Sequence, residues 1–389
     1  MKITEIVCRL LRLPTRRPQR WASLTVDLGS WVVLEIRTDE GLSGWGEATA
    51  LAQWGGDYGR YYGETPGTVR HVVEHLYGPV LLGQDPRELR ERLAAMDAAI
   101  RGHHYARTAV EQALLDVTAR AAGVPVYQLL GGRRRREVPV AHSIGLMPVP
   151  AVLDELEAVL AEGVQTIKIK VGEDTARDVE TVHAVRAAAG DDIDLVVDAN
   201  GGWRSAPEAR RMIEAMAGAR LRYVEQPVAG IVEFEQLARW VDVPLMADES
   251  AWTARDIVDV ARRRAASLAS IYTSKAGGLL AAVRMDAVAE AMGIGTNVNG
   301  SGESGIGNLA NLHLAAVLGS LTEASVFPIT GLDGNRPTRT AMAVYTDDVL
   351  QEPFAYADGE VAVPDGPGWG IDVDPERLRR HTVEEQVIR

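Results

Sequence analysis

Lysine and cysteine are both scarce in this sequence, and no apolar stretch is long. The single cysteine, Cys8, excludes an intrachain disulfide and a cysteine-based metal cluster. No apolar run reaches the roughly 18 residues of a membrane helix, and the N-terminus lacks the basic head and apolar centre of a signal peptide. The net charge of −13 argues against non-specific binding to nucleic acid or acidic membranes. We therefore expect a cytoplasmic protein that binds neither nucleic acid nor membrane.

Only four of the 41 lysine and arginine residues are lysines, and two of these four, Lys168 and Lys170, lie in the segment TIKIKVG. At this spacing the two side chains share one face of a strand. Lysine can lose its proton in a protein interior, whereas arginine cannot. The two ammonium groups disfavour each other's charge, so we expect one pKa to fall toward neutrality and to produce a general base. The alternative is that the lysines only neutralise nearby carboxylates, a role that suits Lys168 better than Lys170.

The order of segments indicates three parts. Residues 1–125 begin with strand-like segments and continue with helical ones, which is typical of an α+β unit. Residues 126–345 alternate short apolar segments with helical ones, as a (β/α)8-type barrel requires. The alternative is an open doubly wound sheet, but the glycine-rich turn of that fold does not follow the first strand-like segment. We expect residues 346–389 to pack back on the first unit. The eight strand-like segments of the middle part are EVPVAHSIG, VQTIKIKVG, IDLVVDAN, LRYVEQP, VPLMADES, LASIYTSKAGG, GIGTNVNG and ASVFPIT.

Three carboxylates, Asp198, Glu225 and Asp248, each follow an apolar run of the middle part. In a barrel the ends of consecutive strands meet at one mouth. Three carboxylates at one mouth repel each other unless a cation lies between them, and oxygen ligands of this charge suit Mg²⁺. The alternative is that each carboxylate caps the helix that follows it, but glutamate is a poor N-cap. We therefore favour a metal site.

These segments, in this order, resemble the mandelate racemase/muconate lactonizing enzyme subgroup of the enolase superfamily. The resemblance rests on GLSGWGEAT near the N-terminus, the K-x-K strand, VVDAN, VEQP and MADES, and the later KAGGL and ESGIGNLANLHLA. It implies a modified TIM barrel with an N-terminal α+β capping domain that the C-terminal tail completes. It also implies a homo-oligomer that acts on a small carboxylate.

The resemblance assigns a role to each polar residue at the strand ends. Asp198, Glu225 and Asp248 would bind Mg²⁺, with Mn²⁺ as the alternative. Lys170 would remove a proton α to the substrate carboxylate, and Lys168 would support that carboxylate. The metal would stabilise the resulting enediolate. The residues expected to hold the metal ligands in place are Asn200 and Glu249.

The segment SIYTSKAGG departs from the subgroup pattern, in which a second catalytic lysine ends the sixth strand. That alignment places Tyr272 at the catalytic position and Lys275 three residues later. Either Tyr272 has replaced the second acid/base, which we favour, or Lys275 reaches into the site. Tyrosine, with a pKa of about 10, is a poor base at neutral pH, so we expect a lyase (dehydratase) or a cycloisomerase. The alternatives are a racemase or epimerase of an amino-acid or proline-like derivative and, more remotely, a non-catalytic barrel.

Substrate-positioning residues are expected in the loops. By the resemblance, the loops at residues 14–28 and 51–59 close over the substrate. The first carries three arginines, of which one is a candidate partner for a second anionic group. A candidate at the mouth of the first strand is His142, with a hydrogen-bonded structural role as the alternative. The residues that we expect to position substrate are Glu303, Trp21 and Trp54, and the three arginines are Arg16, Arg17 and Arg20.

Overall fold

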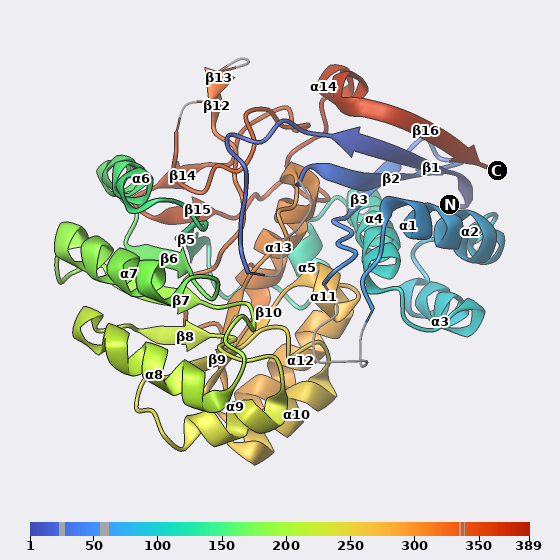
Figure 1. Cartoon of the computed structure of the whole chain (residues 1–389). Helices are drawn as coiled ribbons and strands as arrows, with labels where there is room; N and C mark the ends of the chain where they lie inside the picture. Colours follow the sequence, from blue (N-terminus) through green and yellow to red (C-terminus); the bar gives the residue numbers. More distant parts are fainter. Residues whose placement is uncertain (23–27, 55–61, 334–335, 338) are drawn as a thin grey trace.

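The computed structural model describes residues 1–22, 28–54, 62–333, 336–337 and 339–389. Its N-terminal part builds a four-stranded antiparallel sheet in the order β16–β1–β2–β3. The strands are β1 (Ile3–Arg12), β2 (Ser30–Thr38), β3 (Ser43–Ala48) and β16 (Thr382–Ile388). The C-terminal strand thus lies beside the N-terminal one, and both chain ends are found on the same side of the molecule (Figure 1).

Helices of the N-terminal part pack against this sheet. The longest of them, α4 (His104–Ala122), is buried along most of its length. Gly46 on β3 approaches the backbone of Ala109 on α4 so closely that any Cβ at this position would clash with a carbonyl oxygen. The remaining helices of this part are α1 (Pro66–Val72), the π-helical η1 (Val73–Tyr77), α2 (Gly78–Leu81) and α3 (Leu89–Ala99), and the short α5 (Val126–Leu129) follows at the start of the middle part.

The middle part is a parallel sheet of seven strands in chain order, which confirms the predicted barrel architecture. The helices lie outside the strands (Figure 1). The strands are β5 (Ala141–Ile144), β6 (Thr166–Lys170), β7 (Asp194–Asp198), β8 (Tyr223–Glu225), β9 (Leu245–Ala247), β10 (Leu268–Ile271) and β11 (Gly295–Val298). The helices are α6 (Val149–Ala161), α7 (Thr175–Ala189), α8 (Ala206–Met216), the 3₁₀ helix η2 (Ala217–Ala219), α9 (Ile231–Ala238), α10 (Ala254–Arg263), α11 (Thr273–Ala276), α12 (Leu279–Met292) and α13 (Gly305–Val317).

The barrel closes through a segment that differs from the expected eighth strand. Within ASVFPIT, Val326 bridges Asn299 and Ser325 bridges Val140 as isolated parallel pairs, so the segment joins the two ends of the sheet without forming a continuous ladder. Ser325 donates its N–H to the Pro139 carbonyl and accepts from the Ala141 N–H, which ties it to the first strand. The first strand-like segment also divides, because β4 (Glu137–Pro139) pairs with β15 instead of the barrel sheet.

Short elements follow the eighth barrel segment and precede β16. The strands are β12 (Leu332–Asp333), β13 (Arg336–Pro337), β14 (Tyr356–Ala357) and β15 (Glu360–Ala362), and the helix is α14 (Pro375–His381). In the described part of the chain, no helix combines the length and the apolar character that crossing a membrane requires.

Candidate active site

The predicted metal ligands and lysines come together at the carboxyl ends of the barrel strands. Side chains two positions apart on a strand share a face, and Asp198, Glu225 and Asp248 each lie two positions after a member of one buried cluster. That cluster consists of Val196, Tyr223, Met246 and Leu268. The register places Lys170 beside Asp198 and Asp198 beside Glu225. The apolar cluster therefore forms a layer of the core, and the charged residues form the next layer toward the strand ends.

Both lysines of the K-x-K strand pair with these carboxylates. Lys168 Nζ lies 2.9 Å from Asp198 Oδ2 and 2.8 Å from Glu225 Oε1. Lys170 Nζ donates to Asp198 Oδ2 at 2.6 Å and to Asn200 Oδ1 at 2.9 Å. Lys170 therefore lies at the edge of the cluster, and its side chain is more exposed, at 13%, than that of Lys168, at 4%.

The carboxylates, and not the neighbouring lysine, dominate the electrostatics of Lys168. Burial alone would lower its pKa, but the charges of Asp198 and Glu225 outweigh burial and hold the pKa well above its usual value. This agrees with the alternative in which Lys168 neutralises nearby carboxylates, and the general base stays a prediction for Lys170. For Asp198, burial works against ionisation, yet Lys168 and Lys170 hold its pKa below the usual range.

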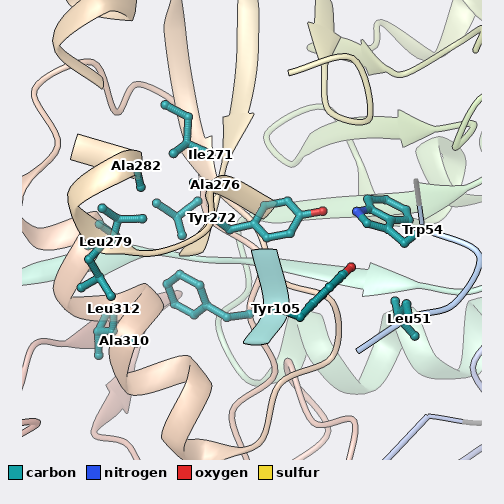
Figure 2. Close-up of a cluster of buried hydrophobic side chains, with 14 of the residues drawn as sticks. Leu51, Trp54, Tyr105, Ile271, Tyr272, Ala276, Leu279, Ala282, Ala310 and Leu312 are labelled. Carbon is teal, nitrogen blue, oxygen red and sulfur yellow. The ribbon is translucent and has the colours of Figure 1, made fainter. Parts of the chain in front are cut away.

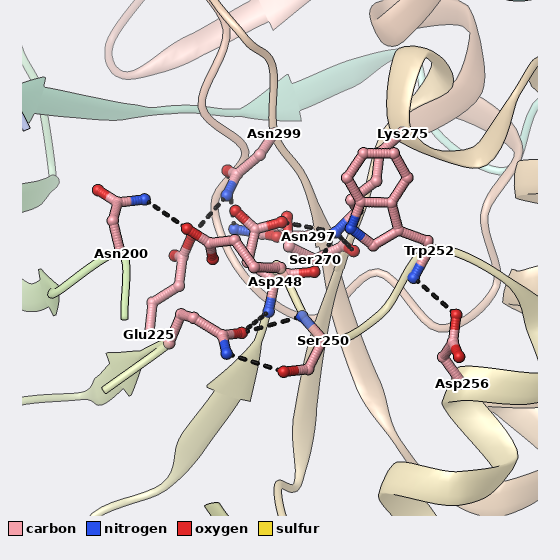
Figure 3. A network of polar contacts seen from close by, with 12 residues as sticks. Asn200, Glu225, Asp248, Ser250, Trp252, Asp256, Ser270, Lys275, Asn297 and Asn299 are labelled. Carbon is pink, nitrogen blue, oxygen red and sulfur yellow. Dashed lines mark hydrogen bonds and ion pairs between the residues drawn. The ribbon is translucent and has the colours of Figure 1, made fainter. Parts of the chain in front are cut away.

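Glu225 and Glu249 each use one carboxylate oxygen to accept hydrogen bonds from neighbouring side chains. Glu225 Oε1 accepts from Lys168 and from Asn299 Nδ2, the latter at 2.9 Å (Figure 3). Glu249 Oε1 accepts from Asn200 Nδ2 at 3.0 Å. In the described part of the chain, Glu225 Oε2 and Glu249 Oε2 are buried without a hydrogen-bond partner. Burial together with the Asp198 charge raises the pKa of Glu225, and burial together with the Asp248 charge raises that of Glu249 to about 8.

These oxygens fit a divalent cation. Within the described residues, no three His, Cys, Asp or Glu side chains already form a metal-binding group, and Lys168 Nζ instead lies between the Asp198 and Glu225 carboxylates. The donors are nonetheless all oxygen atoms, the negative charge is concentrated, and buried carboxylate oxygens are unpaired. This is the donor set that Mg²⁺ and Mn²⁺ select.

Asn299, at the end of the seventh strand, received no role from the sequence. Its Oδ1 accepts from Asn297 Nδ2 at 3.1 Å, which turns its Nδ2 toward Glu225 (Figure 3). The sequence feature that could have identified Asn299 is its position just after a barrel strand, two residues after Asn297.

Lys275 is fully buried and all three of its ammonium hydrogens have acceptors. Its Nζ donates to Asp248 Oδ1 at 2.5 Å, to the Asp248 carbonyl at 2.7 Å and to the Ser270 carbonyl at 2.8 Å. A lysine ammonium has three donors, so this set is complete. The arrangement fits a residue that holds Asp248 in place.

Tyr272 directly follows the sixth strand at the N-terminus of α11, and its side chain is buried. Lys275 Nζ lies 4.7 Å from the centre of this ring. The Tyr272 hydroxyl points toward the indole of Trp54 (Figure 2). Burial and the Asp248 charge raise the pKa of Tyr272 well above its usual value. The phenol therefore stays protonated, so it can donate a hydrogen bond but is not available as a base at neutral pH.

A pocket of about 730 Å³, part of it open to solvent, lies above this cluster. Its floor contains Lys168, Lys170, Asp198, Asn200, Asp248 and Asn299. Its walls include Gln19, Arg20, Trp21, Leu28, Leu51, Trp54, Gly300, Gly302, Val326 and Val344. Trp21 and Trp54, both expected to position substrate, thus face the pocket, and the Trp21 ring centre lies 5.4 Å from Lys170 Nζ. Residues 23–27 and 55–59 of the two expected loops lie outside the described residues.

Glu303 is not among the described residues that line the pocket. Its carboxylate accepts from the Thr49 and Ser274 hydroxyls, both at 3.2 Å, and from the Ser301 N–H at 2.7 Å. It thereby joins the N-terminal domain to the loop that carries Ser301 on the pocket wall. Burial raises the pKa of Glu303.

The chain is similar to known proteins in both sequence and structure. The family model Enolase C-terminal domain-like matches residues 151–377, and the model Mandelate racemase / muconate lactonizing enzyme, N-terminal domain matches residues 3–131. Muconate cycloisomerase 1 of Rhodococcus opacus is 31% identical over 392 residues, which cover 98% of this chain and 99% of that protein. L-Ala-D/L-Glu epimerase of Bacillus subtilis is 32% identical over 376 residues, which cover 95% and 97%. The crystal structure of N-succinyl Arg/Lys racemase from Bacillus cereus matches with a TM-score of 0.90 at 28% identity over the whole of both chains.

Proposed function

The chain belongs to the mandelate racemase/muconate lactonizing enzyme family of the enolase superfamily, and we propose that it is a Mg²⁺-dependent lyase (dehydratase) or cycloisomerase of a small carboxylate. As a member of this family it is an isomerase or a lyase. The reaction would begin with removal of a proton α to the carboxylate, leaving the substrate as an enediolate. The observation that carries the proposal is an asymmetry between two lysines: Lys170 lines the pocket, whereas Lys275, on α11 just after the sixth strand, is not among the described lining residues and has three acceptors of its own.

The proposed mechanism gives a role to each of the lysines and carboxylates of the site. Lys170 Nζ would take the α-proton, since it lies at the pocket floor. Lys168 would place its ammonium beside the substrate carboxylate. Asp198, Glu225 and Asp248 would hold Mg²⁺, which when bound supplies Lewis-acid stabilisation of the negative charge that develops on the carboxylate.

A racemase or epimerase of an amino-acid or proline-like derivative is the second candidate. It is favoured by the presence of L-Ala-D/L-Glu epimerase and N-succinyl-L-Arg/Lys racemase among the relatives. Such a reaction needs an acid/base on each face of the substrate, and Tyr272 would have to act opposite Lys170. Because the raised pKa of Tyr272 opposes its action as a base, we place this reaction second.

Solvent deuterium distinguishes the two reactions. In D₂O with Mg²⁺ and a panel of small carboxylates, we expect α-carbon exchange without inversion, or elimination or ring closure, measured by ¹H NMR and chiral chromatography. Samples with EDTA in place of Mg²⁺ serve as the control and should show neither exchange nor product. Exchange accompanied by inversion would overturn the proposal in favour of a racemase or epimerase.

Metal binding is testable without a substrate. A ligand that binds only the folded state stabilises it by about 2.7 kcal/mol at a hundred times its Kd, so Mg²⁺ should raise the melting temperature. We expect Asp198→Asn to lose this shift, because it removes one ligand charge. Asp154→Asn, on the exposed face of α6, is the matched control and should retain it. An equal shift in both variants would refute the metal assignment.

A further inference from the structure

A buried carboxylate away from the metal cluster, Glu155 on α6, receives side chains from two other parts of the chain. Arg17 makes a two-pronged contact, from Nε to Oε2 and from Nη2 to Oε1, each at 2.8 Å. Arg16 Nη2 lies 3.0 Å from Oε1, and His142 Nε2 lies 2.8 Å from the same oxygen. The side chain of Glu155 is only 6% exposed. Arg16 and Arg17, two of the three loop arginines, therefore form ion pairs with Glu155 inside the protein.

The hydrogen on His142 can be assigned from its other partner. The Met342 N–H donates to His142 Nδ1 at 2.9 Å, so Nδ1 accepts and Nε2 carries the hydrogen that Glu155 receives. Burial lowers the pKa of His142 although Glu155 opposes this, which keeps the imidazole neutral. Burial disfavours the Glu155 carboxylate, but His142 and Arg17 outweigh burial and hold its pKa below the usual range. The cluster is thus an ionised carboxylate with two guanidinium groups and one neutral imidazole.

The arginines of this cluster begin the segment that forms one wall of the pocket. We define residues 14–22 as the substrate loop, which descends from β1 toward the barrel (Figure 1). Beyond Arg17, it contributes Gln19, Arg20 and Trp21 to the pocket. The Arg20 carbonyl accepts from the Leu146 N–H at 2.9 Å, close to the β5 end of the barrel. Trp21 then lies beside Lys170.

We infer that Glu155 is a positioning residue that anchors the substrate loop to the barrel and so sets the place of Trp21 over Lys170. The anchoring rests on the contacts alone, while its meaning for catalysis rests on the proposed function. Hydrogen bonds to a buried, ionised carboxylate are stronger than neutral ones, and a guanidinium pairs with a carboxylate in a fixed plane. Arg17 is therefore held in orientation as well as in position, which a single point contact would not achieve.

Limited digestion with trypsin tests the anchor without a substrate. The Arg20–Trp21 bond lies in the substrate loop, and its cleavage reports how often the loop leaves the barrel. Glu155→Gln keeps the size of the side chain and removes its charge, and we expect cleavage after Arg20 to become roughly tenfold faster. Glu157→Gln, an exposed residue on the same helix, is the matched control and should match the unaltered protein. Equal cleavage rates in Glu155→Gln and the unaltered protein would overturn the inference.

A double-mutant cycle separates anchoring from general loosening. If Arg17 and Glu155 act on each other, Arg17→Met combined with Glu155→Gln should cleave no faster than either single variant. Independent, multiplying effects, or faster cleavage at arginines throughout the chain, would instead mean that Glu155 only stabilises α6, and the inference would fail.

The catalytic consequence is a change in KM. With any carboxylate that the enzyme exchanges, Glu155→Gln should raise KM more than it lowers kcat, because the Lys170–Asp198 contact does not involve Glu155. A fall in kcat with KM unchanged would contradict the positioning role. Absence of exchange in the unaltered protein would refute the proposed function alone, since the digestion result decides the anchor by itself.

Discussion

Replacing Lys170 with alanine is expected to lower the rate of α-proton exchange by a factor of about 10²–10⁴, the contribution of a positioned general base. The side chain lines the pocket, and its Nζ donates to Asp198 and Asn200 and lies 5.4 Å from the centre of the Trp21 ring. The rate is measured by ¹H NMR in D₂O with a carboxylate that the unaltered enzyme exchanges.

Arginine at the same position distinguishes a base from a fixed charge. Lys170→Arg retains the positive charge beside Asp198, but its guanidinium does not give up a proton at working pH. We therefore expect Lys170→Arg to be as inactive as Lys170→Ala. Lys2→Ala, at an exposed lysine, is the control and should exchange at the normal rate. Activity retained in Lys170→Arg would mean that only charge is required and would refute the base assignment.

The sequence predicted the layout of the site because that layout depends on local rules. The alternation of side chains along a strand put Lys168 and Lys170 on one face, and the shared edge of parallel strands brought Asp198 and Glu225 beside them. The electrostatic balance depends on distances that the sequence does not contain. Lys168 Nζ lies within hydrogen-bond distance of two carboxylates, and their charges raise its pKa, which the sequence allowed only as one of two alternatives.

Long-range contacts account for the rest of what could not be predicted. Nothing in the sequence assigned different roles to Arg16, Arg17 and Arg20. Their roles differ because Arg16 and Arg17 pair with Glu155, which lies 138 positions after Arg17. The eighth barrel segment was recognised by its apolar residues, but its pairing is reduced to isolated bridges because it must meet both β11 and the start of the first strand. The surroundings of Tyr272 and Lys275 could not be predicted either, because the burial that raises the pKa of Tyr272 and the three acceptors of Lys275 come from the packing of neighbouring strands.

Replacing Lys275 with methionine should destabilise the protein by about 3–5 kcal/mol, because breaking a buried ion pair leaves its partner charge uncompensated. Methionine fills a similar volume, so the loss would come from Asp248 and from the two carbonyl groups that Lys275 satisfies, and not from a cavity. Urea unfolding followed by circular dichroism, with EDTA present, measures the change in the free energy of unfolding.

Lys2→Met is the matched control for this measurement. Lys2 is exposed, and a surface substitution of this kind should change the free energy of unfolding by less than about 0.5 kcal/mol. If Lys275 were instead an acid/base that reaches into the pocket, its ammonium would not be committed to Asp248 and Ser270, and Lys275→Met would lose activity with little loss of stability. That result would place Lys275 opposite Lys170, on the second face of the substrate. It would favour an epimerase, which needs an acid/base on each face.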